Sequence, residues 1–199
     1  TLSASDVDDV EFEYTASVDG NASVSIDGSS LSISPNLNYY GDIAVSVTVS
    51  DGQVSVSEEF ILNVVQINDS PVLDLIGSQS INEDNTFTYT LSANDVDGDA
   101  LTYSATASDG NISVIGTTLT FTPDQDFNGD IPIDVTVDDG QLADSGNFTL
   151  TVNPVNDAPV LSSIDSQSVD EDNTFTYTLS ASDIDQDILE YAVSVNANA

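Results

Sequence analysis

The chain has 199 residues and contains no lysine, arginine or histidine, whereas 35 of its residues are Asp or Glu, so its formal net charge is −35. Because phosphate contacts need Lys or Arg, this composition excludes nucleic-acid binding through a basic surface. The absence of Cys excludes disulfides and thiolate metal sites, and no apolar run approaches the roughly 18 residues of a membrane-spanning helix.

The acidic residues are 28 Asp and 7 Glu, and no cationic side chain balances them. A compact fold with this charge repels itself, so its counter-ions must come from outside the chain. Short carboxylates are typical of loops and of the oxygen ligands around hard cations. The composition therefore favours a calcium-dependent protein.

An internal repeat organises the chain. The segment TLSASDVDDVEFEY begins at Thr1, TLSANDVDGDALTY begins at Thr90 and TLSASDIDQDILEY begins at Thr178, so successive copies start 89 and 88 residues apart. INEDNTFTYT (81–90) likewise recurs as VDEDNTFTYT (169–178). We therefore predict three domains: 1–68, a repeat that lacks its first strand; 69–156, a complete repeat; and 157–199, the truncated start of a third repeat.

Alternation of apolar and polar residues predicts that the repeats are all-β. In the complete repeat a first strand is expected near Pro71–Ile81. The alternating apolar positions that follow it are Phe87, Tyr89 and Leu91; Leu101 and Tyr103; Ile112 and Val114; Leu119 and Phe121; Ile131, Ile133, Val135 and Val137; and Phe148, Leu150 and Val152. About seven short strands separated by Asp-Gly and Asn-Gly turns predict an immunoglobulin-like β-sandwich.

Three groups of oxygen ligands recur at fixed places in the repeat. They are the Asp-x-Asp-x-Asp run (Asp95, Asp97, Asp99; Asp183, Asp185, Asp187), the linker before a proline (Asn68-Asp69; Asn156-Asp157), and an acidic pair (Glu83-Asp84; Glu171-Asp172). Further oxygens come from Asp124, Asp126 and the Asp138-Asp139-Gly140 turn. Calcium takes 6–8 oxygen ligands in flexible geometry, which suits this set better than magnesium or zinc. The alternative is that these residues are solvated turn positions, where Asp is common.

The succession of a Glu, ANDVDGDALTY, VDDG and VNDAPV within one period resembles the cadherin repeat, and more closely the cadherin-like repeats of giant bacterial surface adhesins. The resemblance implies Greek-key β-sandwich domains in a linear array, with calcium bound between successive domains. It implies these ligands at the first joint: Asn68, Asp69, Asp95, Asp97 and Asp138. It implies these at the second: Glu83, Asn156, Asp157, Asp183 and Asp185. Asp124 or Asp126 occupies the stretch where animal cadherins carry an Asp-Arg-Glu motif.

The function expected from these observations is a calcium-rigidified structural or adhesive spacer, extracellular or at the cell surface. Its expected partners are calcium ions, neighbouring repeats of the same protein, and a homotypic, cell-surface or matrix partner. One alternative is a self-assembling fibre completed by β-strand addition, and another is a carbohydrate-binding module. Without His or Lys no nucleophile and base pair is available, so we expect the segment not to be an enzyme.

Overall fold

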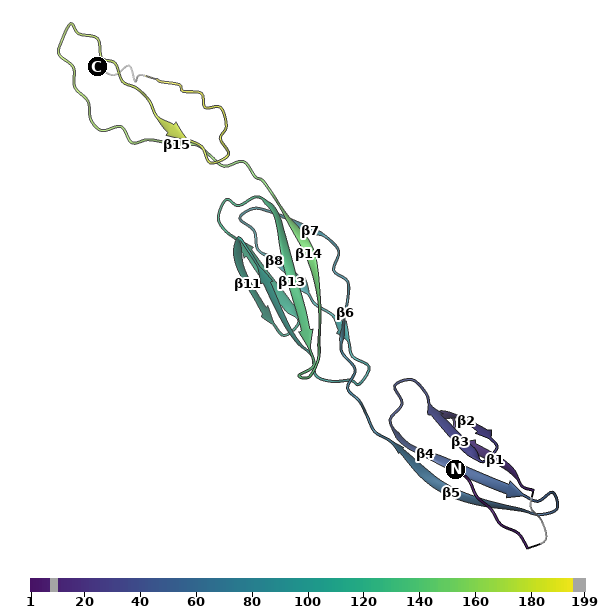
Figure 1. Cartoon of the computed structure of the whole chain (residues 1–199). Coiled ribbons are helices and arrows are strands. Elements are labelled where there is room, and N and C mark those ends of the chain that lie inside the picture. The colour runs from purple at the N-terminus through teal and green to yellow at the C-terminus, as the bar shows by residue number, and fades with distance from the viewer. Residues whose placement is uncertain (8–10, 195–199) are drawn as a thin grey trace. The chain divides into compact units, whose positions relative to one another are not determined.

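The computed structural model describes residues 1–7 and 11–194. Within these residues every regular element is a β-strand (Figure 1), which confirms the all-β prediction. The described part of the chain accordingly contains no helix with the length and apolar character needed to cross a bilayer.

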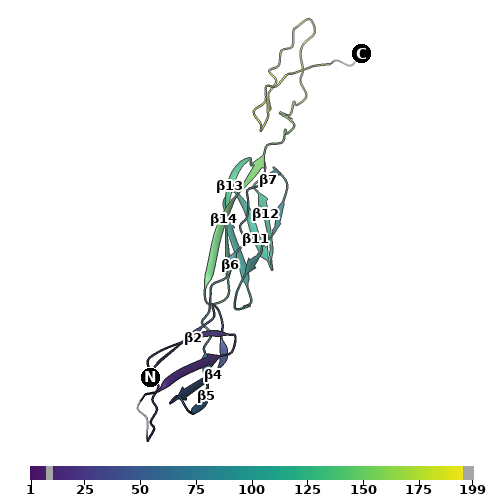
Figure 2. The same ribbon diagram turned by 90° about the vertical axis from the view of Figure 1, so that its right-hand side faces the viewer.

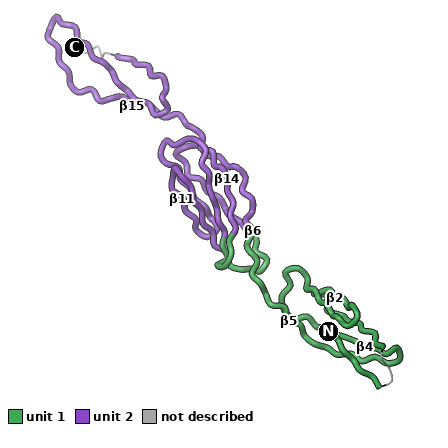
Figure 3. Tube along the Cα trace, viewed as in Figure 1, with its two compact units in different colours: residues 1–72, 94–101, 138–143 green, residues 73–93, 102–137, 144–199 purple. Residues whose placement is uncertain are grey.

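The chain forms two compact units (Figure 3). One contains residues 1–72, 94–101 and 138–143, and the other contains residues 73–93, 102–137 and 144–199. The loops 94–101 and 138–143 belong to the middle repeat by sequence. They are nevertheless in the same compact unit as the linker around Asn68 and Asp69. The three predicted domain ranges follow the sequence period and stay predictions.

The first repeat contains two small antiparallel sheets. Their strands are β1 (Glu13–Val18), β2 (Ala22–Asp27), β3 (Ser30–Pro35), β4 (Gly41–Ser50) and β5 (Ser55–Val64). The sheet orders are β1-β4-β5 and β2-β3. At the turn between β4 and β5 the Asp51 carboxylate accepts hydrogen bonds from the backbone N–H of Gln53 and Val54, both 2.7 Å. Bonds from Val54 and Gln53 hold the pKa of Asp51 below its ordinary value.

The middle repeat contains the hydrophobic core cluster, and Figure 2 shows its strands. Its strands are β6 (Val72–Leu73), β7 (Gln79–Asn82), β8 (Phe87–Thr90), β9 (Ala93–Asn94), β10 (Thr102–Ala107), β11 (Gly110–Ile115), β12 (Thr118–Pro123), β13 (Gly129–Asp138) and β14 (Ala143–Asn153). They form sheets in the orders β10-β13-β14-β7, β11-β12-β8 and β6-β9.

The prediction of a single strand near Pro71–Ile81 is wrong. The structure divides it into β6, which pairs with β9, and β7, which pairs with β14 in parallel. The physical reason is that the two pieces cover edges of different sheets, so residues 74–78 between them carry no strand.

The core of the middle repeat lies on the faces that the alternation predicted. It contains Phe87, Leu91, Leu119, Phe121, Ile131, Ile133, Val135, Phe148, Leu150 and Val152. The polar residues between them along β8 and β13 are at least partly exposed, as a half-buried pleated sheet requires. Leu101 was expected in a strand with Tyr103 but precedes β10.

The described residues of the third segment, 157–194, contain one pair of short strands, β15 (Val160–Leu161) and β16 (Ala181–Ser182). The residues from 162 to 180 between them have no regular strand. Most of its large apolar side chains are exposed, including those of Phe175 and Tyr177.

Candidate metal centres

The Asp-x-Asp-x-Asp run forms a tight loop in the middle repeat. Asp95 Oδ1 accepts hydrogen bonds from the backbone N–H of Asp97 at 2.9 Å and of Asp99 at 3.3 Å. Carboxylate oxygens of Asp95, Asp97 and Asp99 lie within 4.8 Å of one another. The loop thereby gathers three negative charges on one side of the turn.

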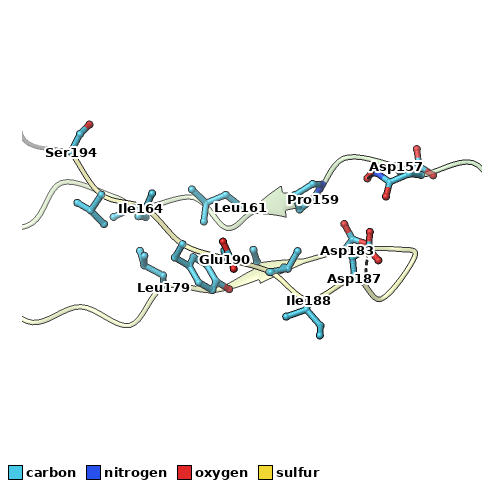
Figure 4. A pocket seen from close by; sticks show the side chains of 16 residues that line it. Asp157, Pro159, Leu161, Ile164, Leu179, Asp183, Asp187, Ile188, Glu190 and Ser194 are labelled. Atoms are coloured by element: carbon cyan, nitrogen blue, oxygen red, sulfur yellow. Dashed lines mark hydrogen bonds between the residues drawn. The ribbon is translucent and has the colours of Figure 1, made fainter.

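The third segment repeats this loop. Asp183 Oδ1 accepts a hydrogen bond from the backbone N–H of Asp185 at 3.0 Å. It accepts another from the backbone N–H of Asp187 at 3.3 Å (Figure 4). Gln186 takes a left-handed φ of 62°, and Gly98 takes 77° at the corresponding position. The same turn therefore forms even where the glycine is replaced.

Each linker aspartate is tied to the following loop by one hydrogen bond. The backbone N–H of Asp69 donates to Asp97 Oδ2 at 2.7 Å, and that of Asp157 donates to Asp185 Oδ2 at 2.6 Å. Because this bond involves a carboxylate, it is stronger than a neutral one. Both copies thus place a linker aspartate beside a loop carboxylate.

Asn68, the linker asparagine of the first unit, forms hydrogen bonds with side chains of the loop 138–143. Asn68 Nδ2 donates to Asp139 Oδ2 at 2.8 Å, and Gln141 Nε2 donates to Asn68 Oδ1 at 2.9 Å. Bonds from the backbone N–H of Leu142 and from Asn68, among others, lower the pKa of Asp139. The lowered pKa favours the ionised form of Asp139, which accepts the hydrogen bond from the linker asparagine.

A larger carboxylate network lies in the second unit. Carboxylate oxygens of Glu83, Asp157 and Asp185 lie within 4.8 Å of one another. Glu83 is 2% exposed; its Oε1 accepts a short hydrogen bond from the backbone N–H of Val155 and its Oε2 accepts one from Asn128 Nδ2 at 3.5 Å. These bonds fix the position of the buried Glu83 carboxyl group within the network.

Asp157 belongs to a second group, in which its carboxylate oxygens lie within 4.8 Å of those of Asp84 and Asp126. The backbone N–H of Asp126 donates to Asp84 Oδ1 at 3.4 Å. Asp84 and Asp126 have φ values of 59° and 55°, a region that Asp tolerates better than most residues. The two turns thus aim their carboxylates at the linker.

The network carries more negative charge than its own hydrogen bonds neutralise. Burial raises the pKa of Asp157, and the charges of Asp126, Asp185, Asp84 and Glu83 raise it further. Asp157 Oδ2 and Asp95 Oδ2 are buried and have no hydrogen-bond partner among the described residues. The sequence has no cationic side chain that could compensate these oxygens, and an all-oxygen donor set fits calcium.

The structure therefore gathers seven of the residues expected as ligands into carboxylate groups. They are Asp95, Asp97 and Asp99 in one unit, and Glu83, Asp126, Asp157 and Asp185 in the other.

The other residues expected as ligands are outside these groups and form local hydrogen bonds. Asn68 and Asn156 donate through Nδ2 to the carbonyl oxygens of Asp69 and Asp157. Asp183 caps its own loop, and Asp138 Oδ1 accepts the backbone N–H of Gly140 at 2.7 Å.

The backbone of Asp124 closes the turn before β13. Its N–H donates to the Asp109 carbonyl oxygen at 2.9 Å, and its carbonyl oxygen accepts the N–H of Phe127 at 3.2 Å. The carboxylates of Asp69, Asp124, Asp138 and Asp183 are in none of the three groups found among the described residues.

Sequence reasoning did not assign Asp84 or Asp139 to a site, although it noted both as members of acidic pairs. It also missed the amide side chains of Gln66 and Gln141; Gln66 Nε2 donates to Asp97 Oδ1 at 3.1 Å. The available signal for Asp84 was its place beside Glu83 in a turn. The spacing of the acidic residues gives no indication of the hydrogen bonds that the amide side chains of Gln66 and Gln141 make.

Comparison with known proteins shows which fold the chain resembles. Residues 68–152 match the family model described as bacterial Ig domain. Human protocadherin-24 EC1-2 superposes with a TM-score of 0.53 and 16% identity, over 76% of this chain and 86% of that one. The fold is thus cadherin-like and of the immunoglobulin type, which confirms the predicted fold class and the resemblance; the tandem linear array stays a prediction.

Two carbohydrate-active proteins also match part of the chain. Chitinase A of Pseudoalteromonas piscicida is 30% identical over 138 residues, which are 65% of this chain and 16% of the chitinase. An endo-fucoidan hydrolase of glycoside hydrolase family 107 is 20% identical with a TM-score of 0.38, over 72% of this chain and 24% of the hydrolase. The chain thus spans a small part of either protein.

Proposed function

We propose that this cadherin-like, immunoglobulin-type β protein is an extracellular spacer whose joints are stiffened by calcium. The observation that carries the proposal is the carboxylate network around Asp157, which combines a raised pKa with a buried, unpartnered oxygen. Such a network opposes folding of the joint unless a cation is bound.

The residues that would hold calcium come from several elements of one unit. Glu83 and Asp84 follow β7, Asp126 precedes β13, Asp157 is in the linker and Asp185 is in the following loop. Five carboxylates, some of them able to bind through both oxygens, can supply the 6–8 ligands of calcium. Asp95, Asp97 and Asp99 would contribute to a second site in the other unit.

Calcium would supply the positive charge that the sequence lacks. The hydrogen bond from Asp157 N–H to Asp185 Oδ2 already sets the linker against the loop. Neutralisation would remove the repulsion between the linker, the loop and the two turns, so that this contact persists. The joint would then resist bending, which is the property that a spacer needs.

An extracellular or cell-surface location agrees with this chemistry. Extracellular calcium modules bind with dissociation constants of about 10⁻⁴–10⁻³ M, which the exterior of a cell can saturate. We propose that the segment serves adhesion by carrying another domain away from the cell, or by contacting a neighbouring repeat, a cell surface or a matrix. We further propose that it has no catalytic activity of its own.

The test is X-ray scattering and thermal unfolding of the chain in calcium and in chelator. Calcium should raise the melting temperature and reduce the spread of conformations that scattering reports. The double variant Asp157→Asn with Asp185→Asn should lose most of the response, whereas Asp165→Asn, at an exposed position outside the network, should keep it. Identical shape and melting temperature in the two solutions would sink the proposal.

The similarity to a chitinase favours a second candidate, a spacer within a secreted polysaccharide-degrading enzyme, or a module that itself binds the polysaccharide. Sugar-binding faces stack on aromatic rings, but the sequence has no Trp. Tyr40 is half exposed and Tyr39 donates its hydroxyl to the Asp42 carbonyl at 2.8 Å. A chitin pull-down separates the two roles: a pure spacer stays in solution, and retention on chitin would establish binding.

A further inference from the structure

One asparagine of the chain is followed directly by glycine, at Asn128-Gly129. Asn128 precedes β13, Gly129 is the first residue of that strand, and both are exposed. Asparagine is chemically labile because its side-chain amide carbon can react with the backbone nitrogen of the next residue. The side chain of that next residue usually shields the nitrogen, and glycine has none. The pair is therefore where this reaction meets the least steric hindrance.

The backbone conformation at this point requires the glycine. Gly129 has a φ of 136°, in a region that residues with a Cβ rarely adopt. The first repeat has a glycine at the corresponding position, Gly41, with a φ of 118°. There the preceding residue is Tyr40, which carries no amide. The same turn thus needs a glycine in both repeats, but an asparagine stands before it in the middle repeat and not in the first.

The side chain of Asn128 is only weakly restrained. Its Nδ2 donates to Glu83 Oε2 at 3.5 Å, which is beyond the usual range of an N–H···O hydrogen bond. The amide of Asn68, by comparison, is held at both ends, through Nδ2 at 2.8 Å and through Oδ1 at 2.9 Å. Little therefore opposes a rotation that brings Cγ of Asn128 toward the nitrogen of Gly129.

We propose that Asn128 deamidates spontaneously, so that the chain gains a carboxyl group beside Glu83 as it ages. The Gly129 nitrogen attacks Cγ of Asn128, the bond from Cγ to Nδ2 breaks, and the proton lost by the attacking nitrogen leaves with the side-chain nitrogen as ammonia. The product is a five-membered succinimide.

Water then opens the succinimide ring. Cleavage between Cγ and the Gly129 nitrogen gives Asp at position 128, whereas cleavage between the backbone carbonyl carbon and the same nitrogen gives iso-Asp. One water is consumed and one ammonia is released for each asparagine converted. The reaction needs no enzyme and no reactant other than solvent.

The modification changes the surroundings of the buried Glu83 carboxyl group. The amide donor of Asn128 is replaced by an acidic oxygen that is ionised at neutral pH. Glu83 keeps its hydrogen bond from the Val155 N–H but gains a like charge beside Oε2. Like charges and lost donors both disfavour a buried carboxylate, so the modified chain should be less stable. Bound calcium should lessen this loss; that consequence alone rests on the proposed function.

The first experiment is peptide mapping of the chain after incubation at mildly alkaline pH. A protease that cuts before Asp releases residues 126–129 from the unmodified chain. Asp at position 128 creates an additional cut inside this peptide. Iso-Asp raises the mass of the peptide by about 1 Da, as any deamidation does, but creates no cut. Mass spectrometry of the digest therefore measures both products.

Asn38 is the internal control, because it is exposed in the turn before β4 and is followed by Tyr39. We expect position 128 to be modified at least about tenfold faster than position 38, since the Gly129 nitrogen has no side chain beside it. The variant Asn128→Gln keeps an amide but must close a slower six-membered ring, so it should stay unmodified over the same period. Equal rates at positions 128 and 38 would overturn the proposal.

The effect on Glu83 has its own test. The variant Asn128→Asp carries one of the two products from the start, and in chelator its melting temperature should fall by about 3 °C or more. Asn147→Asp adds the same charge at an exposed position outside the carboxylate network, so it controls for net charge. A fall no larger than that of the control would show that the new carboxyl does not act on Glu83.

The same two variants in calcium separate this proposal from the calcium proposal. We expect the fall caused by Asn128→Asp to be smaller in calcium than in chelator. An equal fall in both solutions, together with fast modification at position 128, would support the deamidation site and remove only the calcium consequence.

Discussion

At the scale of single residues, the chemistry concentrates on Asp157. It is the residue shared by two carboxylate groups, its N–H is bonded to Asp185, and its Oδ2 is buried without a partner. Its raised pKa means that the ionised form is disfavoured in the folded chain, so at neutral pH the ionised carboxylate opposes folding. One side chain thereby links the calcium proposal to stability.

The substitution Asp157→Asn should stabilise the chain in chelator but weaken its binding of calcium. In chelator it removes one charge from a repulsive group, so the melting temperature should rise, by about 2 °C. In calcium it removes a ligand, so the apparent calcium affinity should fall by about tenfold or more. Thermal unfolding monitored by circular dichroism in both solutions measures this, with Asp165→Asn as control. A change of the same sign in both solutions would contradict the assignment.

At the scale of elements, the middle repeat is closely packed where β11 meets β12. A methyl group added at Gly110 would lie 2.5 Å from the Thr122 carbonyl oxygen and 2.6 Å from the ring of Phe121. The first repeat has Ala22 and Ile33 at the corresponding positions. The smaller side chain of Ile33 accompanies the larger residue at position 22, which indicates that the two positions are coupled by volume.

Gly110→Ala should therefore destabilise the middle repeat by about 1–3 kcal/mol, because overpacking forces β11 and β12 apart. Urea unfolding measures the loss, and Gly20→Ala is the matched control because no atom lies within 4 Å of its added methyl group. The cost should be smaller when Phe121→Ile is already present. An equal cost in both backgrounds would show that the Phe121 ring is not the obstacle.

At the scale of the whole molecule, charge dominates. The net charge of −35 has no internal compensation, so the folded chain is under general electrostatic repulsion as well as the local repulsion at the linkers. General repulsion is screened by any salt, whereas the proposed sites require a divalent cation. The two contributions can therefore be separated.

In chelator, the melting temperature should rise continuously with sodium chloride, because the screening length falls from about 10 Å at 0.1 M to about 3 Å at 1 M. In saturating calcium the rise should be smaller, since the closest carboxylates are already neutralised. A salt titration followed by circular dichroism in both solutions is the measurement. A flat or falling curve in chelator would show that repulsion does not limit stability.

Much of the fold could be predicted because the strands alternate strictly. The apolar positions of β8, β12 and β13 lie in the core as expected, since successive side chains of a strand point to opposite faces. The division of the first strand into β6 and β7 could not be predicted, because it depends on which sheet edges need covering. Local sequence does not contain that information.

The candidate site, like the fold, could be predicted from the sequence only in part. The repeat identified Asp95, Asp97, Asp157 and Asp185 as candidate ligands, because the same spacing of acidic residues recurs in each copy. Spacing could not reveal that Asp84 reaches Asp157, or that Asp139 and Gln141 hold Asn68. These contacts join segments more than 70 residues apart.

The sequence alone therefore determined the all-β class, the period, the lack of internal cations and most of the candidate acidic ligands, since each follows from residue type and local spacing. Only the tertiary structure decided which carboxylates converge and which oxygens remain buried without partners. Those properties depend on distances between strands and loops that are remote in sequence.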